Sequence, residues 1–393
     1  MFYQRSIYPV IKKSVNKKEI VVLTGMRRVG KTTLYRMIYD ELPSENKVFL
    51  DMENPISQRI FEERDYQNIM HNLRDFGIDP EGKAYIFLDE IQAMPSLVRA
   101  VKYLYDHFHI KFFLTGSSSY YLKNLFPESL AGRKFIFELF PLDFQEFLVF
   151  QNEEKGIHRN WKEREQKKSV FGFERFQKYF DAYLRFGGFP EVALAKGNNE
   201  KKMKLNDIFT SYFEKDVKML SDFRDISSLR DTMFLLMQRV GSKIDVSKIA
   251  GEIGVARETI YSYLSFLEST YFVSFLRPFT RSVDREVSGA RKVYLCDTGF
   301  LNEFAKVSEG SLFENAVFLN LRKHGKLQYY QKRTGAEIDF ILNGKIAFEV
   351  KTTAVRQDTT RLEKITKPLG LRERYVISRN FVGEKNIIPC IEL

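Results

Sequence analysis

The hydrophobic residues in the first third of the chain occur in short runs separated by segments with helical spacing. The first run, residues 19–24, is apolar and β-branched after its leading Glu19, as expected of a buried strand. Residues 33–42 then place their apolar side chains at helical spacing and end before Pro43. Similar apolar runs follow at 47–51, 84–90, 110–118 and 134–139. Strands that alternate with helices predict an α/β fold with an open parallel sheet.

The pattern becomes helical and strongly charged after residue 145. Residues 151–178 carry many charges and indicate helix or a solvated insertion, and Gly187-Gly188 marks a turn between helical segments. A glycine pair of this kind belongs to a packing turn more often than to a hinge. We interpret residues 146–228 as a helical lid.

Residues 246–267 predict two helices separated by a tight turn at Gly254. The apolar residues at core spacing are Ile249, Ala250, Ile253, Val255, Ile260, Leu264 and Leu267. This pattern is typical of a helix-turn-helix, and the exposed start of its second helix would carry Arg257, Glu258, Thr259, Tyr261 and Ser262. Because winged helices also serve as protein-contact or dimerisation modules, DNA contact and protein contact both stay open.

The β-prone segments that follow, 271–279 and 292–296, indicate a winged hairpin. The basic residues assigned to its tip are Arg281, Arg285, Arg291 and Lys292. A basic tip beside a helix-turn-helix favours DNA contact.

The C-terminal part contains two β-prone runs that meet at Asn343-Gly344, a strong hairpin signal. Pairing across this turn would bring Asp339 and Glu349 to one face, and strand alternation points Lys351 to the same side. A preceding helix could add Glu314 as a further ligand. Two carboxylates and a lysine can hold Mg²⁺ and activate water for phosphodiester cleavage, although a charged hairpin without a catalytic role explains the spacing as well.

Composition and charge limit the class of protein. The 393 residues suffice for two to four domains, and no apolar run approaches the ~20 residues that span a bilayer. With two cysteines the chain has neither a disulfide framework nor a zinc cluster, and we expect a cytoplasmic protein with no membrane partner. The formal charge of +11 favours an acidic polymer such as DNA as partner, although lysine-rich surfaces also serve solubility.

Residues 25–32 read Gly-Met-Arg-Arg-Val-Gly-Lys-Thr and complete a G-x-x-x-x-G-K-[ST] loop between the first predicted strand and helix. Such a loop binds phosphate through backbone amides at a helix N-terminus. We expect Lys31 to reach the β- and γ-phosphates of ATP and Thr32 to offer its hydroxyl to Mg²⁺. The residues expected to surround the nucleotide are Gly25, Arg27, Arg28, Gly30, Lys31, Thr32 and Thr33.

The run at 84–90 ends in two adjacent carboxylates, as a Walker-B strand does. Asp89 would hold Mg²⁺ and Glu90 would act as general base on the attacking water, whereas the simpler interpretation is that both cap the next segment. The run at 110–118 resembles the sensor strand of an additional-strand NTPase, with Thr115 or Ser117 as the residue that touches the γ-phosphate. Arg133 is available as an arginine finger in cis or in trans, or is a simple surface residue.

Taken together, these residues resemble a family of prokaryotic, notably archaeal, AAA+-like ATPases with a C-terminal domain of uncharacterised function. The motifs that carry the resemblance are residues 23–33, 87–92, 114–118, 130–133, 140–147, 187–190, 335–340 and 349–351. The family's tail also looks like a PD-(D/E)xK nuclease core, of which this chain keeps Asp339 and the Glu-x-Lys of 349–351 but not the proline–aspartate pair. The resemblance implies ATP hydrolysis and association with DNA.

We therefore expect a P-loop NTPase fold in four parts. These are a P-loop ATPase domain at 1–145, the helical lid at 146–228, a winged helix-turn-helix at 229–300, and a nuclease-like α/β domain at 301–393.

Three functions suit this organisation. The first is an ATPase that acts on DNA, whose nucleotide state moves the lid and winged helix and controls a metal-dependent nuclease-like domain. The second is a nucleotide-dependent switch or scaffold that binds DNA or a protein and has a catalytically silent tail. The third is a signalling NTPase that forms a homo-oligomer upon ATP binding, with Arg133 acting in trans.

Overall fold

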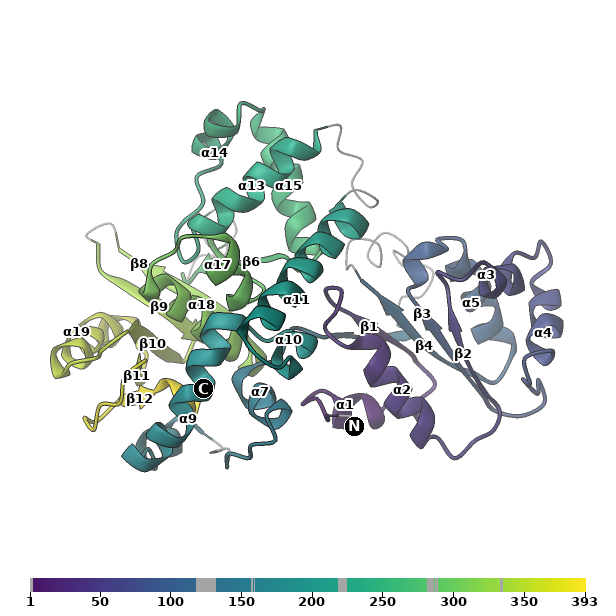
Figure 1. Ribbon diagram of the computed structural model, residues 1–393, viewed down its shortest axis with the longest axis horizontal. Coiled ribbons are helices and arrows are strands. Elements are labelled where there is room, and N and C mark those ends of the chain that lie inside the picture. The colour runs from purple at the N-terminus through teal and green to yellow at the C-terminus, as the bar shows by residue number, and fades with distance from the viewer. Residues whose placement is uncertain are drawn as a thin grey trace. The chain divides into compact units, whose positions relative to one another are not determined.

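The computed structural model describes residues 3–117, 132–156, 158, 160–217, 225–280, 286, 289–332 and 335–393. The chain forms two compact units (Figure 1). The first contains Met1–Phe140 and Ser269–Tyr271, and the second contains Pro141–Glu268 and Phe272–Leu393.

The first unit is built on a five-stranded sheet in the order β2-β3-β4-β1-β5. All of its strand pairings are parallel, which confirms the predicted parallel α/β sheet. The strands are β1 Ile20–Thr24, β2 Lys47–Asp51, β3 Ala84–Asp89, β4 Ile110–Gly116 and β5 Lys134–Glu138. Strand β4 lies between β1 and β3, so the loop after β1 and the acidic end of β3 face one another across the end of β4.

Helices connect these strands and cover the sheet (Figure 1). They are α1 Tyr8–Lys12, α2 Lys31–Glu41, α3 Pro55–Phe61, α4 Tyr66–Arg74 and α5 Leu97–His107. Strand β1 is buried along its whole length, and β3 and β4 are buried almost throughout. The continuous apolar runs in the sequence therefore correspond to strands that are covered on both faces of the sheet.

The second unit contains α-helices and a π-helix. They are α7 Phe144–Phe150, α8 Trp161–Gln166, α9 Val170–Phe186, α10 Pro190–Leu194, α11 Asn198–Ser211, the π-helix η2 Tyr212–Val217, α13 Ile226–Gln238, α14 Val246–Ile253, α15 Arg257–Ser269, α17 Thr298–Phe304, α18 Glu309–Leu321 and α19 Arg356–Thr366. The segment interpreted as a lid is helical wherever regular structure is described, but its action as a lid stays a prediction.

A seven-stranded mixed sheet completes the second unit, in the order β12-β11-β10-β9-β8-β6-β7. Its strands are β6 Val273–Pro278, β7 Lys292–Leu295, β8 Leu327–Gln331, β9 Glu337–Leu342, β10 Ile346–Lys351, β11 Glu373–Ser378 and β12 Ile387–Pro389. Strands β6 and β7, assigned to the wing, thus share one sheet with the C-terminal strands. The expected boundary between residues 300 and 301 falls between two strands of this sheet, so the structure does not separate these segments into independent domains.

The helix-turn-helix pattern is present at the expected residues. Helix α14 ends at Gly254, whose left-handed φ of 80° suits glycine, and α15 begins at Arg257. Ile249, Ile260 and Leu264 are buried as predicted, whereas Ile253 and Val255 are half-buried. The polar residues at the start of α15 are exposed, except that Thr259 is half-buried.

The wing tip differs from the prediction at Lys292. This side chain is only 6% exposed and faces acidic residues of the same unit, so it is not a surface cation. The prediction was wrong because a lysine at the start of a strand usually lies at the surface. Here every residue of β7, including Lys292, is buried. Arg281 and Arg285 lie outside the described residues.

The Gly187-Gly188 pair forms a packing turn between α9 and α10. Gly187 has a φ of 77°, and a Cβ there would lie 1.9 Å from Asp297 Oδ1. The buried Asp297 carboxylate accepts hydrogen bonds from the backbone N–H groups of Gly188 at 2.6 Å and Gly299 at 2.8 Å. Only glycine allows this close approach, which fits the packing interpretation of the pair.

No helix in the described part of the chain is both long enough and apolar enough to cross a membrane.

Candidate functional site

The loop between β1 and α2 needs glycine at both ends. Gly25 has a φ of 150°, and a Cβ there would lie 2.0 Å from the carbonyl oxygen of Leu139. Gly30, the residue before α2, has a left-handed φ of 95°. The chain therefore turns tightly out of β1 and enters α2 with its first free N–H groups at the loop, as a phosphate site requires. Thr33 follows in the first turn of α2.

Lys31 is held inside the curve of this loop. Its side chain is buried, and Nζ donates hydrogen bonds to the carbonyl oxygens of Gly25 at 2.9 Å and Met26 at 3.1 Å. These two contacts hold a cation at the centre of the loop. Phosphate oxygens are stronger acceptors for such an ammonium than carbonyl oxygens, so the loop suits a nucleoside triphosphate.

Asp89 joins the loop to the neighbouring strands. One carboxylate oxygen accepts a hydrogen bond from Thr32 Oγ1 at 2.7 Å, and the other accepts one from the Thr115 hydroxyl. Burial raises the pKa of Asp89 and outweighs the opposing effect of the two hydroxyls. A hydroxyl and a carboxylate side by side at a phosphate loop form the ligand pair that Mg²⁺ takes together with phosphate oxygens, so these residues fit the metal.

Thr115 holds the acidic end of β3 in place. It donates to Asp89, and its Oγ1 accepts a hydrogen bond from the backbone N–H of Glu90 at 2.9 Å. Its hydroxyl is therefore engaged with the Walker-B residues. Contact with the γ-phosphate stays a prediction for Thr115 and for the buried Ser117.

Gln92 contacts Glu90, although the sequence analysis predicted no role for it. Its Nε2 donates to a carboxylate oxygen of Glu90, and its Oε1 accepts from the backbone N–H of Ser117 at 3.4 Å. Gln92 thus orients Glu90 and links it to the end of β4. Gln92 is the last residue of the 87–92 motif, so the sequence did mark its position. The motif does not indicate which side chains hydrogen-bond between neighbouring strands.

The arginines expected near phosphate lie in different places. Arg27 Nη1 lies 3.4 Å from Glu53 Oε1, and Arg28 occupies the loop with a left-handed φ of 65°. Arg133 lies at the opposite edge of the sheet, because its carbonyl oxygen accepts from Ile20 N–H at the start of β1. There its Nε lies 3.4 Å from Asp106 Oδ1. This placement does not suit an arginine finger in cis, and action in trans stays a prediction.

The predicted C-terminal carboxylates do gather in the second unit. Strands β9 and β10 pair antiparallel, with Phe340 opposite Phe348, and Asp339 and Glu349 are the next residues along the two strands. Asp339 Oδ2 accepts the backbone N–H of Val350 at 2.8 Å. Lys351 Nζ lies 2.8 Å from Glu349 Oε1, so the hairpin and its common face follow the prediction.

Glu314 from α18 approaches the same cluster. Burial, reinforced by the charge on Asp339, raises the pKa of Glu314 to about 7, and the same two causes raise the pKa of Glu349 to about 7. Tyr294 donates its hydroxyl to Glu314 Oε1 at 2.7 Å. The carboxylates are therefore close enough to repel one another.

Lys292 supplies the cation that this cluster needs. Its Nζ lies 2.5 Å from Glu337 Oε1 and 3.5 Å from Glu314 Oε1. Burial by itself lowers the pKa of Lys292, but the surrounding carboxylates together raise it above its usual value. A lysine from β7 thus offsets part of the negative charge of α18 and β9.

The predicted metal site is not formed by these residues. In the described part of the chain, no three His, Cys, Asp or Glu side chains are placed to hold one ion. Glu314, Asp339 and Glu349 share a region, but Glu314 is engaged by Lys292 and Tyr294, and Glu349 by Lys351. The arrangement therefore does not fit a divalent cation as it stands.

Lys31→Ala should abolish detectable ATP binding, a loss of at least about 100-fold, because the triphosphate loses its nearest fixed cation. The measurement is calorimetric titration with ATP and Mg²⁺. Arg36→Ala, which removes an exposed charge further along α2, should leave the affinity unchanged. Unchanged affinity in Lys31→Ala would contradict the assignment of the loop.

Comparison with known families agrees with this geometry. Residues 17–148 match a family described as an AAA domain. Residues 177–311 and 309–386 match two domains of unknown function, DUF8612 and DUF4143.

Two relatives that match most of the chain bear the name uncharacterized protein. One from Methanocaldococcus jannaschii is 30% identical over 371 residues, which cover 90% of this chain and 80% of that protein. One from Haemophilus influenzae is 26% identical over 352 residues, covering 84% of this chain and 83% of that protein.

A solved structure, the Walker-type ATPase of Pyrococcus abyssi, aligns with a TM-score of 0.50 at 14% identity. The alignment covers 77% of this chain and 96% of that chain, and it shows a similar fold only. This chain is 30% identical to the Methanocaldococcus protein over most of both sequences, and its N-terminal part matches the AAA domain. The chain therefore belongs to a family of archaeal and bacterial AAA-like P-loop ATPases.

Proposed function

We propose that this ATPase is a nucleotide-dependent switch that binds DNA through helix α15 and whose C-terminal carboxylate cluster is catalytically silent. The observation that carries the ATP chemistry is the connected set of Thr32, Asp89 and Thr115 at the phosphate loop. Mg²⁺ bound with the nucleotide would neutralise charge on the β- and γ-phosphates. Thr32 and Asp89 are the residues that would hold it.

Glu90 is the residue placed to act as general base. Its backbone has a left-handed φ of 54°, which is uncommon for a residue with a side chain and is maintained by the hydrogen bond from its N–H to Thr115. Gln92 then fixes the direction of the carboxylate. In this position Glu90 can accept a proton from water while Asp89 serves the metal.

Glu90→Gln should keep ATP affinity within about twofold of wild type and reduce turnover by about 10²–10⁴-fold, because it removes the base and not a metal ligand. The assay is steady-state phosphate release combined with a binding titration. Glu62→Gln, an exposed carboxylate of the same unit, should turn over normally. Normal hydrolysis by Glu90→Gln would mean that Glu90 is structural.

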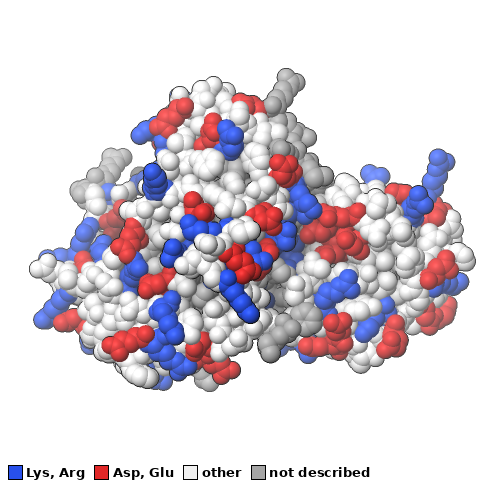
Figure 2. Space-filling model, viewed as in Figure 1, with Lys and Arg blue, Asp and Glu red and all other residues white. Residues whose placement is uncertain are grey.

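The support for DNA contact comes from the start of α15. Arg257, Glu258, Tyr261 and Ser262 are exposed, and Tyr261 is 56% exposed despite its large ring. Exposed polar and aromatic residues at the N-terminal end of the second helix are what a recognition helix presents to DNA. The net positive charge adds little support for DNA contact on the face shown in Figure 2, because basic and acidic side chains are interspersed there.

The residues that follow α15 offer a route by which nucleotide could influence this helix. Ser269–Tyr271 belong to the first unit, where the Tyr271 hydroxyl lies 3.3 Å from Thr24 Oγ1 and 3.1 Å from Glu138 Oε1. Thr24 is the last residue of β1, directly before the phosphate loop. A shift of the loop on nucleotide binding would therefore reach the segment that continues from α15.

Arg257→Ala should weaken binding to duplex DNA by about 5–150-fold, corresponding to the loss of one arginine contact of about 1–3 kcal/mol. The measurement is fluorescence anisotropy with and without a non-hydrolysable ATP analogue. Arg230→Ala removes an exposed arginine of α13 and serves as the matched control. If wild-type protein binds no DNA in either nucleotide state, the assignment of α15 as a DNA-binding helix is wrong.

The choice of a silent cluster over a nuclease depends on Lys292. The ammonium of Lys292, 2.5 Å from Glu337 and 3.5 Å from Glu314, places a cation beside one of the three predicted metal ligands. A buried ion pair of this kind is costly to break. This supports the second of the functions considered from the sequence, with a metal-dependent nuclease as the competing candidate.

Plasmid and branched DNA should stay intact with Mg²⁺ or Mn²⁺, with and without ATP, for both wild type and Asp339→Ala. The reason is that Glu314 is paired with Lys292 and Glu349 with Lys351, and among the described residues the carboxylates form no ligand set. Gel analysis of nicked and linear products is the measurement. Cleavage by wild type that disappears in Asp339→Ala would establish the nuclease and overturn the silent assignment.

A further inference from the structure

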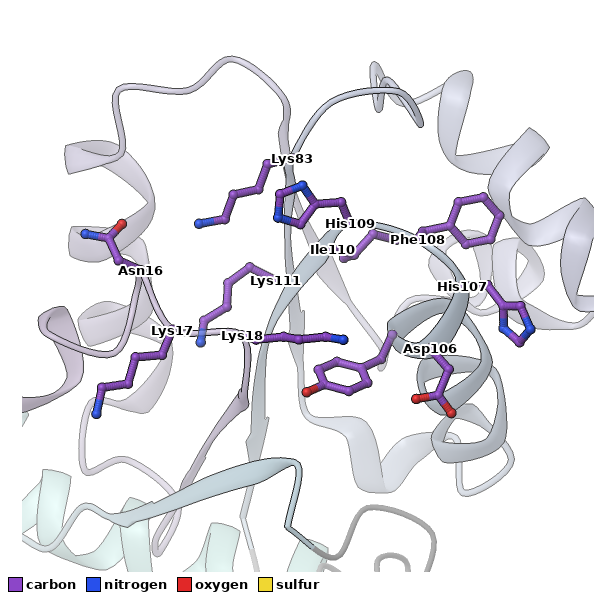
Figure 3. A pocket seen from close by; sticks show the side chains of 11 residues that line it. Asn16, Lys17, Lys18, Lys83, Asp106, His107, Phe108, His109, Ile110 and Lys111 are labelled. Carbon is purple, nitrogen blue, oxygen red and sulfur yellow. The ribbon is translucent and has the colours of Figure 1, made fainter.

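A basic pocket opens at the amino edge of the sheet in the first unit (Figure 3). It has a volume of about 430 Å³ and is lined by residues 16–18, Lys83 and residues 105–111. These residues precede β1 and β3 and connect α5 to β4. The phosphate loop lies at the carboxyl ends of the same strands, so the pocket is distinct from the nucleotide site.

The lining is rich in amino groups. Lys17, Lys18, Lys83 and Lys111 contribute four cations, and Asp106 is the one carboxylate among the lining residues. Asp106 already faces Arg133, whose Nε lies 3.4 Å away. Within the described part of the chain, none of the four lysines has a carboxylate oxygen within ion-pair distance. The pocket therefore holds an excess of positive charge.

Lys111 is the most deeply placed of these lysines. It lies in β4 with 1% of its surface exposed, and its Nζ donates to the carbonyl oxygen of Glu19. An ammonium has three donors, and among the described residues this is the hydrogen bond that it makes. Burial lowers the pKa of Lys111 to about 8; the charge of Glu19 opposes this effect, and those of Lys83 and Lys17 add to it. An anion in the pocket would offset both the burial and the repulsion.

Aromatic rings hold the other ammonium groups in position. The Nζ atoms of Lys17, Lys18 and Lys83 lie 5.0, 5.1 and 4.9 Å from the ring centres of Phe135, Tyr105 and Tyr85. Side chains supported in this way lose less conformational entropy when they bind a ligand. In Figure 3, Lys83 and Lys111 extend toward the segment that carries Asn16, which adds an amide to the charged lining.

We propose that this pocket is a second anion site, which binds a small molecule carrying several phosphate groups. Lysine ammonium groups bind phosphate as point charges. Four of them suit a ligand with several negative charges better than a ligand with a single carboxylate. The volume falls in the range of small-molecule sites, roughly 300–1,000 Å³. A nucleic-acid strand would instead need an extended basic groove. The proposal stands on the pocket itself and does not depend on the function of the second unit.

The test is calorimetric titration with tripolyphosphate while the phosphate loop is saturated with a non-hydrolysable ATP analogue and Mg²⁺. A repeat in Lys31→Ala excludes binding at the loop. Saturable binding to one site is expected, and Lys83→Ala should weaken it by at least about tenfold, the effect of one charged hydrogen bond. Lys111→Met should weaken it further, and Lys83→Ala keeps the test valid if Lys111→Met does not fold.

Lys306→Ala, an exposed lysine of the second unit, is the control for net charge and should bind as wild type does. Absence of saturable binding would overturn the proposal, as would equal losses in Lys83→Ala and Lys306→Ala. If a short single-stranded oligonucleotide binds at this site and tripolyphosphate does not, the pocket belongs to a nucleic-acid surface and the small-molecule assignment is wrong. These results are independent of whether α15 binds DNA.

Discussion

The parallel pairing of β1, β4 and β3 is the constraint on which the nucleotide site depends. Parallel strands end at the same edge of a sheet, so the loop after β1 meets the carboxylates after β3 without any long-range adjustment. Because β4 lies between them, Thr115 can hydrogen-bond Asp89 and the backbone of Glu90 at once. Residues that lie far apart in the chain become one hydrogen-bonded set because of strand order alone.

The two units stabilise buried carboxylates by different means. In the first unit, Asp89 is satisfied by the hydroxyls of Thr32 and Thr115, which a metal-bound nucleotide can rearrange at small cost. In the second unit, Glu314 and Glu337 are paired with the ammonium of Lys292, which carries a full charge. Hydroxyl groups leave the negative charge of Asp89 available to a cation, whereas the ammonium of Lys292 offsets part of the charge around it. The buried carboxylate of the first unit thus has hydroxyl partners, whereas Glu314 of the second unit has an ammonium partner.

The same sheet supports two basic regions with separate surroundings. Lys31 lies at the carboxyl edge and is held by backbone carbonyl oxygens of its own loop. Lys111 lies at the amino edge, with Lys17, Lys18 and Lys83 around it. A parallel sheet therefore offers one edge for the nucleotide and leaves the other free to take a different anion.

Local patterns in the sequence were sufficient for the strands of the first unit, the phosphate loop, the two helices on either side of Gly254 and the Asn343-Gly344 hairpin. Each depends on neighbouring residues: buried runs, glycine positions and alternation along a strand. Three features needed the tertiary structure. Lys292 became a buried partner of Glu337 because β7 is buried in the second unit, and Arg133 lies at the amino edge because β5 pairs with β1 in parallel. Gln92, which follows β3, reaches Ser117 at the end of the neighbouring β4. Contacts between strands depend on sheet order and burial, which spacing along the chain does not contain.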